Sequence, residues 1–219
     1  MPVLLKPSSL FGRPDRRARP PIVLLIGAHR EELSFGDAVA EHLDRQRIDL
    51  LRIPVGISGR RPGPDAIEGY RRRHAELYRQ ILEHVQPEQR VLIDLHTGFD
   101  ERLYSADVLC AEPALLSCIE RERAECAAAS GGDVRPVRLV TADREAPARG
   151  LPGDQADAWP DAWPRVRPEL PVAVYASTAP LYIGVEVYLA APSRAASAEA
   201  RFAAAVIAVV GDCGLSVTS

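Results

Sequence analysis

Apolar residues along the chain follow two patterns, short continuous runs and longer stretches with helical spacing. The continuous runs have the length of strands that a sheet buries on both faces. They predict strands over residues 22–26, 48–53, 91–95, 103–110, 137–140, 171–175 and 182–189. Helical spacing predicts helices over residues 34–46, with Ser34 as N-cap, and over 67–82, 113–129 and 193–210. This alternation predicts a three-layer α/β/α fold with a mostly parallel, mixed central sheet.

Two segments fall outside this alternation. Residues 1–20 hold four prolines and four arginines, which is typical of an extended, solvated N-terminal arm. Residues 21–219 then form a single domain. Inside it, residues 141–170 form a long proline-rich loop that contains Trp159 and Trp163. A loop of this length inside a compact domain is usually functional or disordered, so we treat it as a candidate lid.

Composition and charge narrow the class of protein. The chain has 219 residues, 47% of them hydrophobic, and a net charge of -3, which gives no general attraction to nucleic acid or anionic membrane. No apolar run approaches the roughly 18 to 20 residues that span a bilayer. Cys110, Cys118, Cys126 and Cys213 have no CxxC spacing, so we expect buried, reduced thiols. These features predict a cytoplasmic location.

The first candidate for chemistry is the segment 27–32, Gly-Ala-His-Arg-Glu-Glu, which directly follows the first predicted strand. His29 and Glu32 are three positions apart, so one helical turn places both side chains on the same side. An imidazole nitrogen and a carboxylate oxygen can then hold two corners of a zinc ion. Such pairs also occur on solvated helix faces. Open α/β sheets bind ligands at the carboxyl ends of strands, and this position favours a metal site.

The second candidate is Asp94-Leu95-His96, at the end of another apolar strand. In an extended strand, Asp94 and His96 point to the same side, so Asp94 can orient His96. The alternative is a structural histidine that bonds to a backbone carbonyl. Two histidines and one carboxylate leave a fourth zinc position for water, which is the pattern of catalytic zinc sites.

The third candidate is Glu186, the lone carboxylate in the otherwise apolar strand 183–189. Unpaired buried carboxylates are costly, so such a residue is usually paired, bound to metal or catalytic. The alternative is a strand with one face in solvent, since the apolar residues at odd positions share the other face.

Taken in order, these segments resemble the three motifs of the succinylglutamate desuccinylase/aspartoacylase family, which has a zinc-carboxypeptidase-like fold. The family's motifs read Gly-x-His-Gly-Asn-Glu, Asp-Leu-His followed by Thr or Asn, and Gly-Ile-Glu-Val-Gly. Residues 27–32, 94–97 and 184–188 match them, and the resemblance spans about residues 22–210.

The resemblance implies one zinc ion per chain, bound by His29, Glu32 and His96, with Asp94 behind the ligands. It also implies hydrolysis of an amide with Glu186 as general base. In such a reaction, zinc activates water and polarises the carbonyl, while the base carries a proton to the leaving amine.

Further residues match the family less closely. Arg52 is followed after six residues by Gly59-Arg60, where the family has Asn-Arg. The resemblance implies that Arg52 stabilises the oxyanion and that Arg60 binds a substrate carboxylate, with Arg61 as the alternative. Tyr175 matches a substrate-binding tyrosine. We expect no C-terminal β domain of the kind that longer members add.

We therefore expect a zinc-dependent deacylase that releases a carboxylic acid from an N-acyl amino acid or a related small amide. Two alternatives stay open, a zinc carboxypeptidase acting on a small peptide and a zinc-binding homologue without turnover. The expected partner is a small-molecule substrate. The sequence indicates neither nucleic acid nor membrane as a partner, and it leaves a homo-oligomer open.

Overall fold

A computed structural model of the protein describes residues 19–99, 105–130, 132–141, 163–177, 179–189 and 197–219. The N-terminal arm, apart from its last two residues, lies outside the described residues. So does most of the predicted 141–170 loop, including Trp159. The predictions for these two segments stay predictions.

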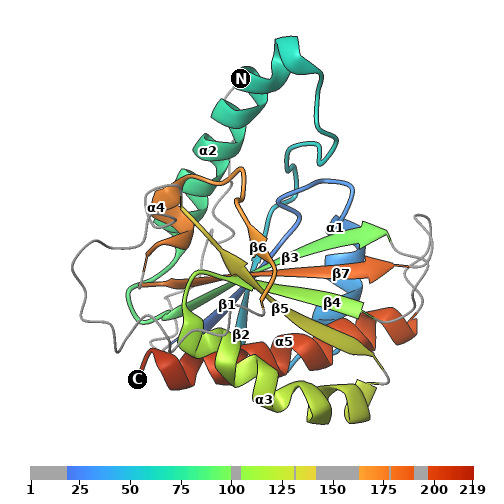
Figure 1. The fold of residues 1–219 in the computed structure, drawn as a ribbon. Helices are drawn as coiled ribbons and strands as arrows, with labels where there is room; N and C mark the ends of the chain where they lie inside the picture. Colours follow the sequence, from blue (N-terminus) through green and yellow to red (C-terminus); the bar gives the residue numbers. More distant parts are fainter. Residues whose placement is uncertain (1–18, 100–104, 131, 142–162, 178, 190–196) are drawn as a thin grey trace, which may run out of the picture.

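The described residues form a seven-stranded sheet in the order β2-β1-β3-β7-β4-β5-β6 (Figure 1). Five of its six neighbouring strand pairs are parallel, and β4 and β7 are antiparallel. The strands are β1 (Ile22–Ile26), β2 (Ile48–Arg52), β3 (Val91–Phe99), β4 (Ser105–Cys110), β5 (Asp133–Leu139), β6 (Arg165–Val166) and β7 (Leu181–Leu189).

Helices cover both faces of the sheet. They are α1 (Leu33–Ala40), α3 (Pro113–Ser130) and α5 (Ser197–Val217) on one face, with α2 (Ile67–His84) and α4 (Val172–Tyr175) on the other. A short 3-10 helix, η1 (Pro64–Ala66), precedes α2. Two apolar cores result, one on each face. The predicted three-layer α/β/α arrangement with a mostly parallel, mixed sheet is confirmed.

Strand alternation decides which side chains face the site. In β3, Ile93 and Leu95 belong to the core beneath α1, α3 and α5. Leu92 belongs to the core beneath α2 and α4, and Asp94 bonds to Tyr78 of α2. Because successive side chains point to opposite faces, His96 also lies on the α2 side.

One predicted strand is wrong. Residues 171–175 do not extend a sheet, because Val172–Tyr175 form the single helical turn α4. Pro171 stands just before that turn with φ near -56°, where its missing N–H costs no helical hydrogen bond. Val174 and Tyr175 are buried together. A run this short has no periodicity that separates a strand from a buried helical turn.

The first helix is shorter than the predicted range of 34–46. It ends at Ala40, and its N-cap is Glu32 rather than Ser34. The Glu32 side chain makes no capping bond to the helix backbone, because its oxygens are directed to two imidazoles instead.

By length and composition alone, the window Ala198–Val217 of helix α5 is apolar enough to cross a membrane. Charged residues at positions 199, 201 and 212 interrupt it, so it is not a continuous apolar run. Fifty-six per cent of that window is buried inside the protein, where α5 contacts α1, α3 and β3. Burial against the sheet accounts for its apolar composition.

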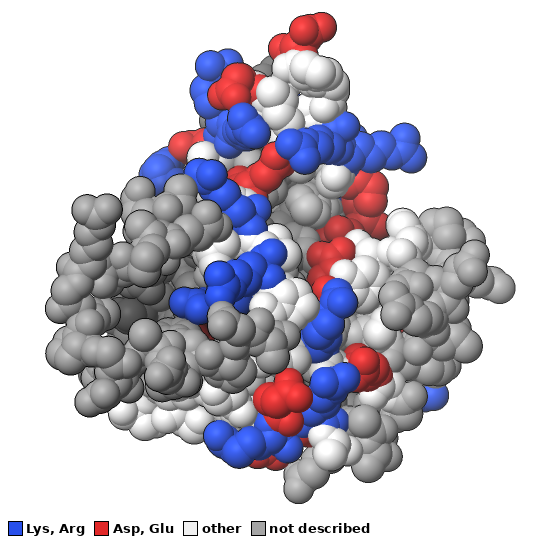
Figure 2. Space-filling view, in the orientation of Figure 1, with Lys and Arg blue, Asp and Glu red and all other residues white. Residues whose placement is uncertain are grey.

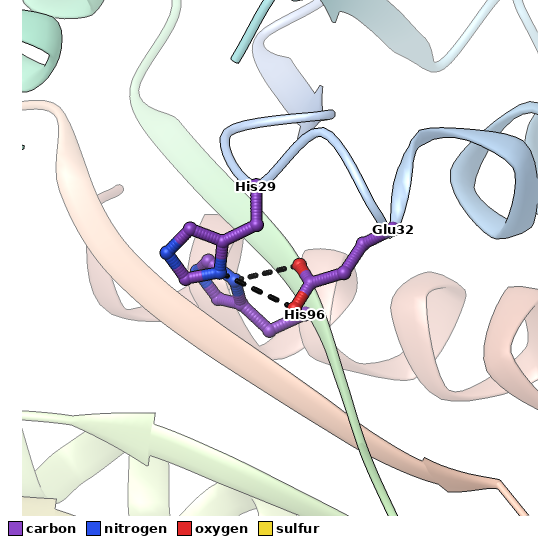
Figure 3. Close-up of side chains that lie close together, drawn as sticks. All are labelled: His29, Glu32 and His96. Carbon is purple, nitrogen blue, oxygen red and sulfur yellow. Dashed lines mark hydrogen bonds and ion pairs between the residues drawn. The ribbon is translucent and has the colours of Figure 1, made fainter. Parts of the chain in front are cut away.

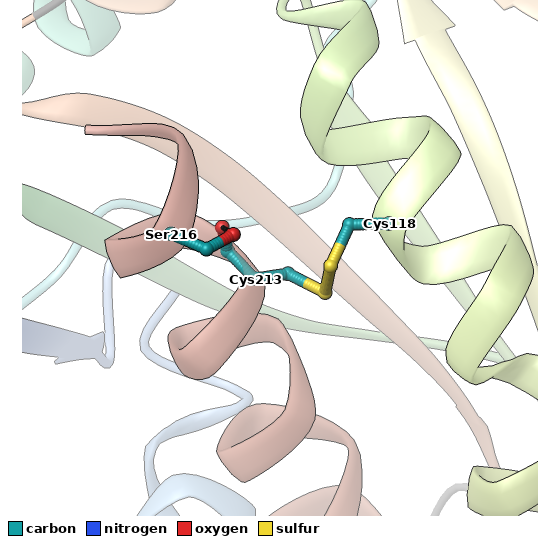
Figure 4. The surroundings of a disulfide bond; sticks show 3 residues. All are labelled: Cys118, Cys213 and Ser216. Carbon is teal, nitrogen blue, oxygen red and sulfur yellow. Dashed lines mark hydrogen bonds between the residues drawn. A yellow bond between two sulfur atoms is a disulfide. The ribbon is translucent and has the colours of Figure 1, made fainter. Parts of the chain in front are cut away.

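Two of the four cysteines are not the predicted reduced thiols. Cys118 of α3 and Cys213 of α5 form a disulfide across 95 positions of the sequence (Figure 4). Cys110 is a free, buried thiol as expected, and burial raises its pKa to about 12. Because disulfides are rare in reducing cytosol, the cysteines no longer support the predicted cytoplasmic location.

Candidate metal centre

The backbone that carries His29 is fixed by a close approach of two loops. Gly27 has a φ of +79°, and a Cβ at Gly56 would lie 2.1 Å from the Gly27 carbonyl oxygen. Ile57 then bridges the loop after β1, donating to Ala28 O at 3.0 Å and accepting from Arg30 N at 2.9 Å. Side chains at either glycine would prevent this approach.

His29, Glu32 and His96 converge at the carboxyl ends of β1 and β3 (Figure 3). One oxygen of Glu32 lies 3.2 Å from His29 Nδ1, and the other lies 3.1 Å from His96 Nδ1. One ligand atom from each residue lies within 4.8 Å of the others. These three residues therefore form a group that can hold a metal ion, although their role as zinc ligands stays a prediction.

The surroundings of Glu32 favour its ionised form. Burial by itself raises the pKa of its carboxyl, but the hydrogen bonds and charges of His29 and His96 outweigh burial and lower it. An ionised carboxylate between two imidazole nitrogens supplies the mixed oxygen and nitrogen donors that zinc binds.

Behind His96 stands a fully buried carboxylate. Asp94 Oδ2 lies 3.0 Å from His96 Nε2 and accepts hydrogen bonds from the hydroxyls of Tyr78 and, at 2.8 Å, Tyr182. Asp94 thus orients the ring so that Nδ1 faces Glu32. Among the described residues, Asp94 Oδ1 has no hydrogen-bond partner.

Behind His29 stands a residue that none of the three sequence motifs contains. His74 of α2 is buried, and its Nε2 lies 3.3 Å from His29 Nε2. Burial and the neighbouring His29 lower the pKa of His74 to about 4, so the ring is neutral at pH 7. The sequence does indicate that His74 is buried, since it shares the apolar stripe of α2 with Tyr70 and Tyr78.

Glu186 of β7 is the register partner of His96 on β3. Burial raises the pKa of its carboxyl, and the charge of Glu32 adds to this effect while His96 opposes it. No hydrogen bond to Glu186 occurs among the described residues. A Cβ at Gly98 would lie 3.0 Å from Glu186 Oε1, so this glycine leaves room for the carboxylate.

A cavity of about 370 Å³ opens beside these residues. Its polar end holds the three candidate ligands together with His74 and Glu186. Its apolar wall comes from the ends of β4 and β5, from β6 and from the segment after it, through Leu109, Leu139, Val166 and Leu170. The described end of the predicted loop, residues 163–170, therefore contributes to the cavity, while residues 142–162 lie outside the described residues.

None of the four predicted substrate-contacting residues, Arg52, Arg60, Arg61 and Tyr175, is among those that line this cavity. The Arg52 guanidinium pairs with Asp37 of α1, through bonds of 2.7 and 2.8 Å, and is not among the residues that line the cavity. Tyr175 is buried in the core under α2, with its hydroxyl 3.4 Å from Val140 O. The sequence matched these residues by spacing, which does not fix the direction of a side chain.

The arginines at positions 60 and 61 differ in their surroundings. Arg61 lies 2.7 Å from Glu169, a residue of the cavity wall, and Arg71 of α2 lies 3.7 Å from the same carboxylate. Arg60 is exposed. Gly59 lines the cavity, where a Cβ would lie 3.2 Å from His29 Cγ, so the larger asparagine of the family motif would crowd this ring.

Charges on the face that contains α2 are mixed in sign. Figure 2 shows basic and acidic side chains interspersed over this helix and below it. On α2, Arg71 pairs with Glu68, and Arg79 pairs with Glu76 and Glu83. Such pairs are typical of a solvated helix face.

No protein family matches the chain, and neither does any curated protein sequence. Among solved structures, the CwlD amidase from Clostridioides difficile, in complex with the GerS lipoprotein, is similar at a TM-score of 0.47 and 10% identity. The match covers 90% of this chain and 98% of that one. Murine aminoacylase 3 is similar at 0.44 and 11%, over 91% of this chain and 66% of its own length. At these values neither likeness assigns a family or an activity.

Proposed function

We propose that this protein is a zinc-dependent amide hydrolase, a deacylase of the succinylglutamate desuccinylase/aspartoacylase type. One observation carries the proposal. Two imidazole Nδ1 atoms and a partly buried carboxylate meet at the end of the sheet, beside a second partly buried carboxylate that has no hydrogen-bond partner among the described residues.

The residues fit a zinc ion by the chemistry of their donors. Two imidazoles and one carboxylate are a ligand set of catalytic zinc sites, which leave one position for water or substrate. The carboxylate of Asp94 behind His96 is the usual support for a ligating histidine. When bound, the ion polarises the substrate carbonyl and lowers the pKa of a water molecule.

Proton transfer and substrate packing are proposed for the chain's own residues. Glu186, next to His96 across the β3–β7 pair, accepts a proton at its carboxylate and delivers it to the nitrogen of the leaving amine. Burial raises the pKa of this carboxyl, which suits a group that must both take and give a proton. The apolar wall of the cavity offers a surface on which an apolar part of the substrate can pack.

The proposed substrate is an N-acyl amino acid or a related small amide. A cavity of about 370 Å³ suits a small molecule. Among the described residues, no lysine or arginine lines this cavity, but Arg61 reaches its wall through Glu169. We assign the substrate carboxylate to Arg61 rather than Arg60.

We keep the cytoplasm as the proposed location of the protein.

Two measurements test this proposal together. Elemental analysis of protein purified without added metal should give about one zinc per chain. The same preparation should hydrolyse members of a panel of N-acyl amino acids and release a free amino acid. Hydrolysis of short peptides alone would make the protein a carboxypeptidase. Zinc without turnover of any amide would make it a binding homologue, and the lack of zinc would refute the metal centre.

A further inference from the structure

His74 touches the candidate metal centre from the side opposite the Glu32 carboxylate. Its Nε2 lies 3.3 Å from His29 Nε2, while His29 Nδ1 lies 3.2 Å from Glu32. The two nitrogens of His29 therefore face different partners. This placement is independent of the sequence motifs, because His74 lies on α2, 45 positions from His29.

We propose that His74 is a positioning residue that holds His29 for the metal by accepting a hydrogen bond from its Nε2–H. The proposal rests on the proposed zinc centre. An imidazole that binds a metal through Nδ1 keeps its proton on Nε2, and this proton needs an acceptor. The atom of His74 that faces this proton is Nε2, which accepts when the proton of its own ring lies on Nδ1.

This arrangement has a structural cost that packing does not explain. With Nε2 as acceptor, the His74 proton lies on Nδ1, which is buried and has no partner among the described residues. An apolar residue of similar size would fill the same space without burying an unpaired N–H. The bond to His29 is what an apolar residue lacks.

Helix α2 supports both candidate histidine ligands, His29 and His96, from neighbouring turns. Tyr78, one turn after His74, donates to the carboxylate of Asp94, which in turn bonds His96. The rings of His74 and Tyr78 lie 5.2 Å apart, and Tyr70 stacks on His74 at 5.5 Å. The ring of His74 is therefore held on both sides, and its Nε2 is fixed toward His29.

Two amide variants separate positioning from packing. Glutamine at position 74 can place its carbonyl oxygen near the present Nε2, whereas asparagine is too short to reach it. We expect His74→Gln to keep zinc affinity within about threefold of wild type. His74→Asn should lose about 10-fold to 100-fold, the usual effect of removing a partner of a ligating histidine. His84→Gln, an exposed position of α2, should change nothing.

The readouts do not depend on turnover. Zinc affinity is measured by competition with a chromophoric chelator, and the visible spectrum of the cobalt-substituted protein reports the geometry of the ligands. The melting temperature of metal-free protein controls for folding. If Asn and Gln variants bind zinc equally well, or show the same cobalt spectrum, His74 does not position His29. If wild-type protein binds no zinc, it is the proposed function that fails.

Discussion

The two imidazoles of the candidate metal centre are held in different ways. His96 lies on β3, an inner strand paired with β1 and β7, and its Nε2 faces the buried carboxylate of Asp94. His29 lies in the loop after β1, and its Nε2 faces the neutral ring of His74. One ligand is thus fixed by the sheet and a charge, the other by a loop, a helix and a neutral partner.

The two kinds of support should respond differently to substitution. A charge-assisted hydrogen bond in a buried setting is about twice as strong as a neutral one. The hydrogen bond between Asp94 and His96 should therefore be the stronger of the two, and its removal should lower zinc affinity more. The His29 half depends on contacts between segments far apart in the sequence, so it should respond more gradually to substitution.

The largest effect should come from removing an imidazole. His29→Ala and His96→Ala each delete one of three ligands, and we expect neither variant to retain zinc after dialysis. Metal content by elemental analysis, with circular dichroism as a control for folding, measures this. A variant that keeps zinc near stoichiometry would remove that histidine from the ligand set.

Glu186→Gln should separate catalysis from zinc binding by the two histidines. We expect zinc content to stay unchanged while turnover falls about 100-fold or more, because the amide cannot accept the proton. Burial raises the pKa of Glu186 from its usual 4.5, so the base form is lost as pH falls through this raised pKa. The acid limb of the wild-type kcat/KM profile should lie above pH 4.5, and the residual activity of the variant should lack it. Loss of zinc in this variant would make Glu186 a ligand instead.

Asp94→Asn tests the charged half. The amide keeps the shape of the side chain but loses the charge that faces His96, so zinc affinity should fall by about 100-fold, at the upper end for such partners. The fall should exceed that of His74→Asn, because the lost hydrogen bond is charge-assisted. Chelator competition on both variants gives the comparison. Equal losses would mean that charge makes no difference between the halves.

Tyr182→Phe gives a smaller change in the same half. It removes one of two hydroxyl donors to Asp94 and leaves the donor from Tyr78. We expect zinc affinity to fall by about threefold and unfolding free energy by about 1 kcal/mol, the value of a single buried hydrogen bond. Urea titration and chelator competition measure these quantities. A tenfold loss of affinity would show that Asp94 cannot hold His96 with one tyrosine.

Loss of the disulfide should not affect zinc binding at the metal centre. Replacing Cys118 and Cys213 together by serine removes a crosslink on the face of the sheet opposite α2. The free energy of unfolding should fall by about 2 to 4 kcal/mol, with zinc affinity unchanged. Thiol labelling of the unfolded wild-type protein, with and without reductant, shows whether the bond forms. If the same number of thiols is labelled with and without reductant, the disulfide does not form.

The local pattern of the chain carried much of the fold. Continuous apolar runs identified β1, β3 and β7, because strands buried on both faces need few polar positions. The apolar residues of β2 and β4 also predicted strands, although Asp49 and Asp107 interrupt them. The same rule failed at residues 171–175, where four apolar residues fit a buried helical turn equally well. It also missed the first residues of β5, where Asp133 and Arg135 interrupt the apolar pattern at the sheet edge.

For the site, two short motifs at strand ends already contained the three side chains that converge. The sequence also singled out Glu186, because a carboxylate stands out in an apolar strand. Only the tertiary structure decided that His74 backs His29, that Arg52 turns to Asp37, and that Cys118 meets Cys213. The physical reason is distance along the chain. Strand periodicity fixes which face a residue occupies, but contacts across 15 to 95 positions depend on how helices pack on that face.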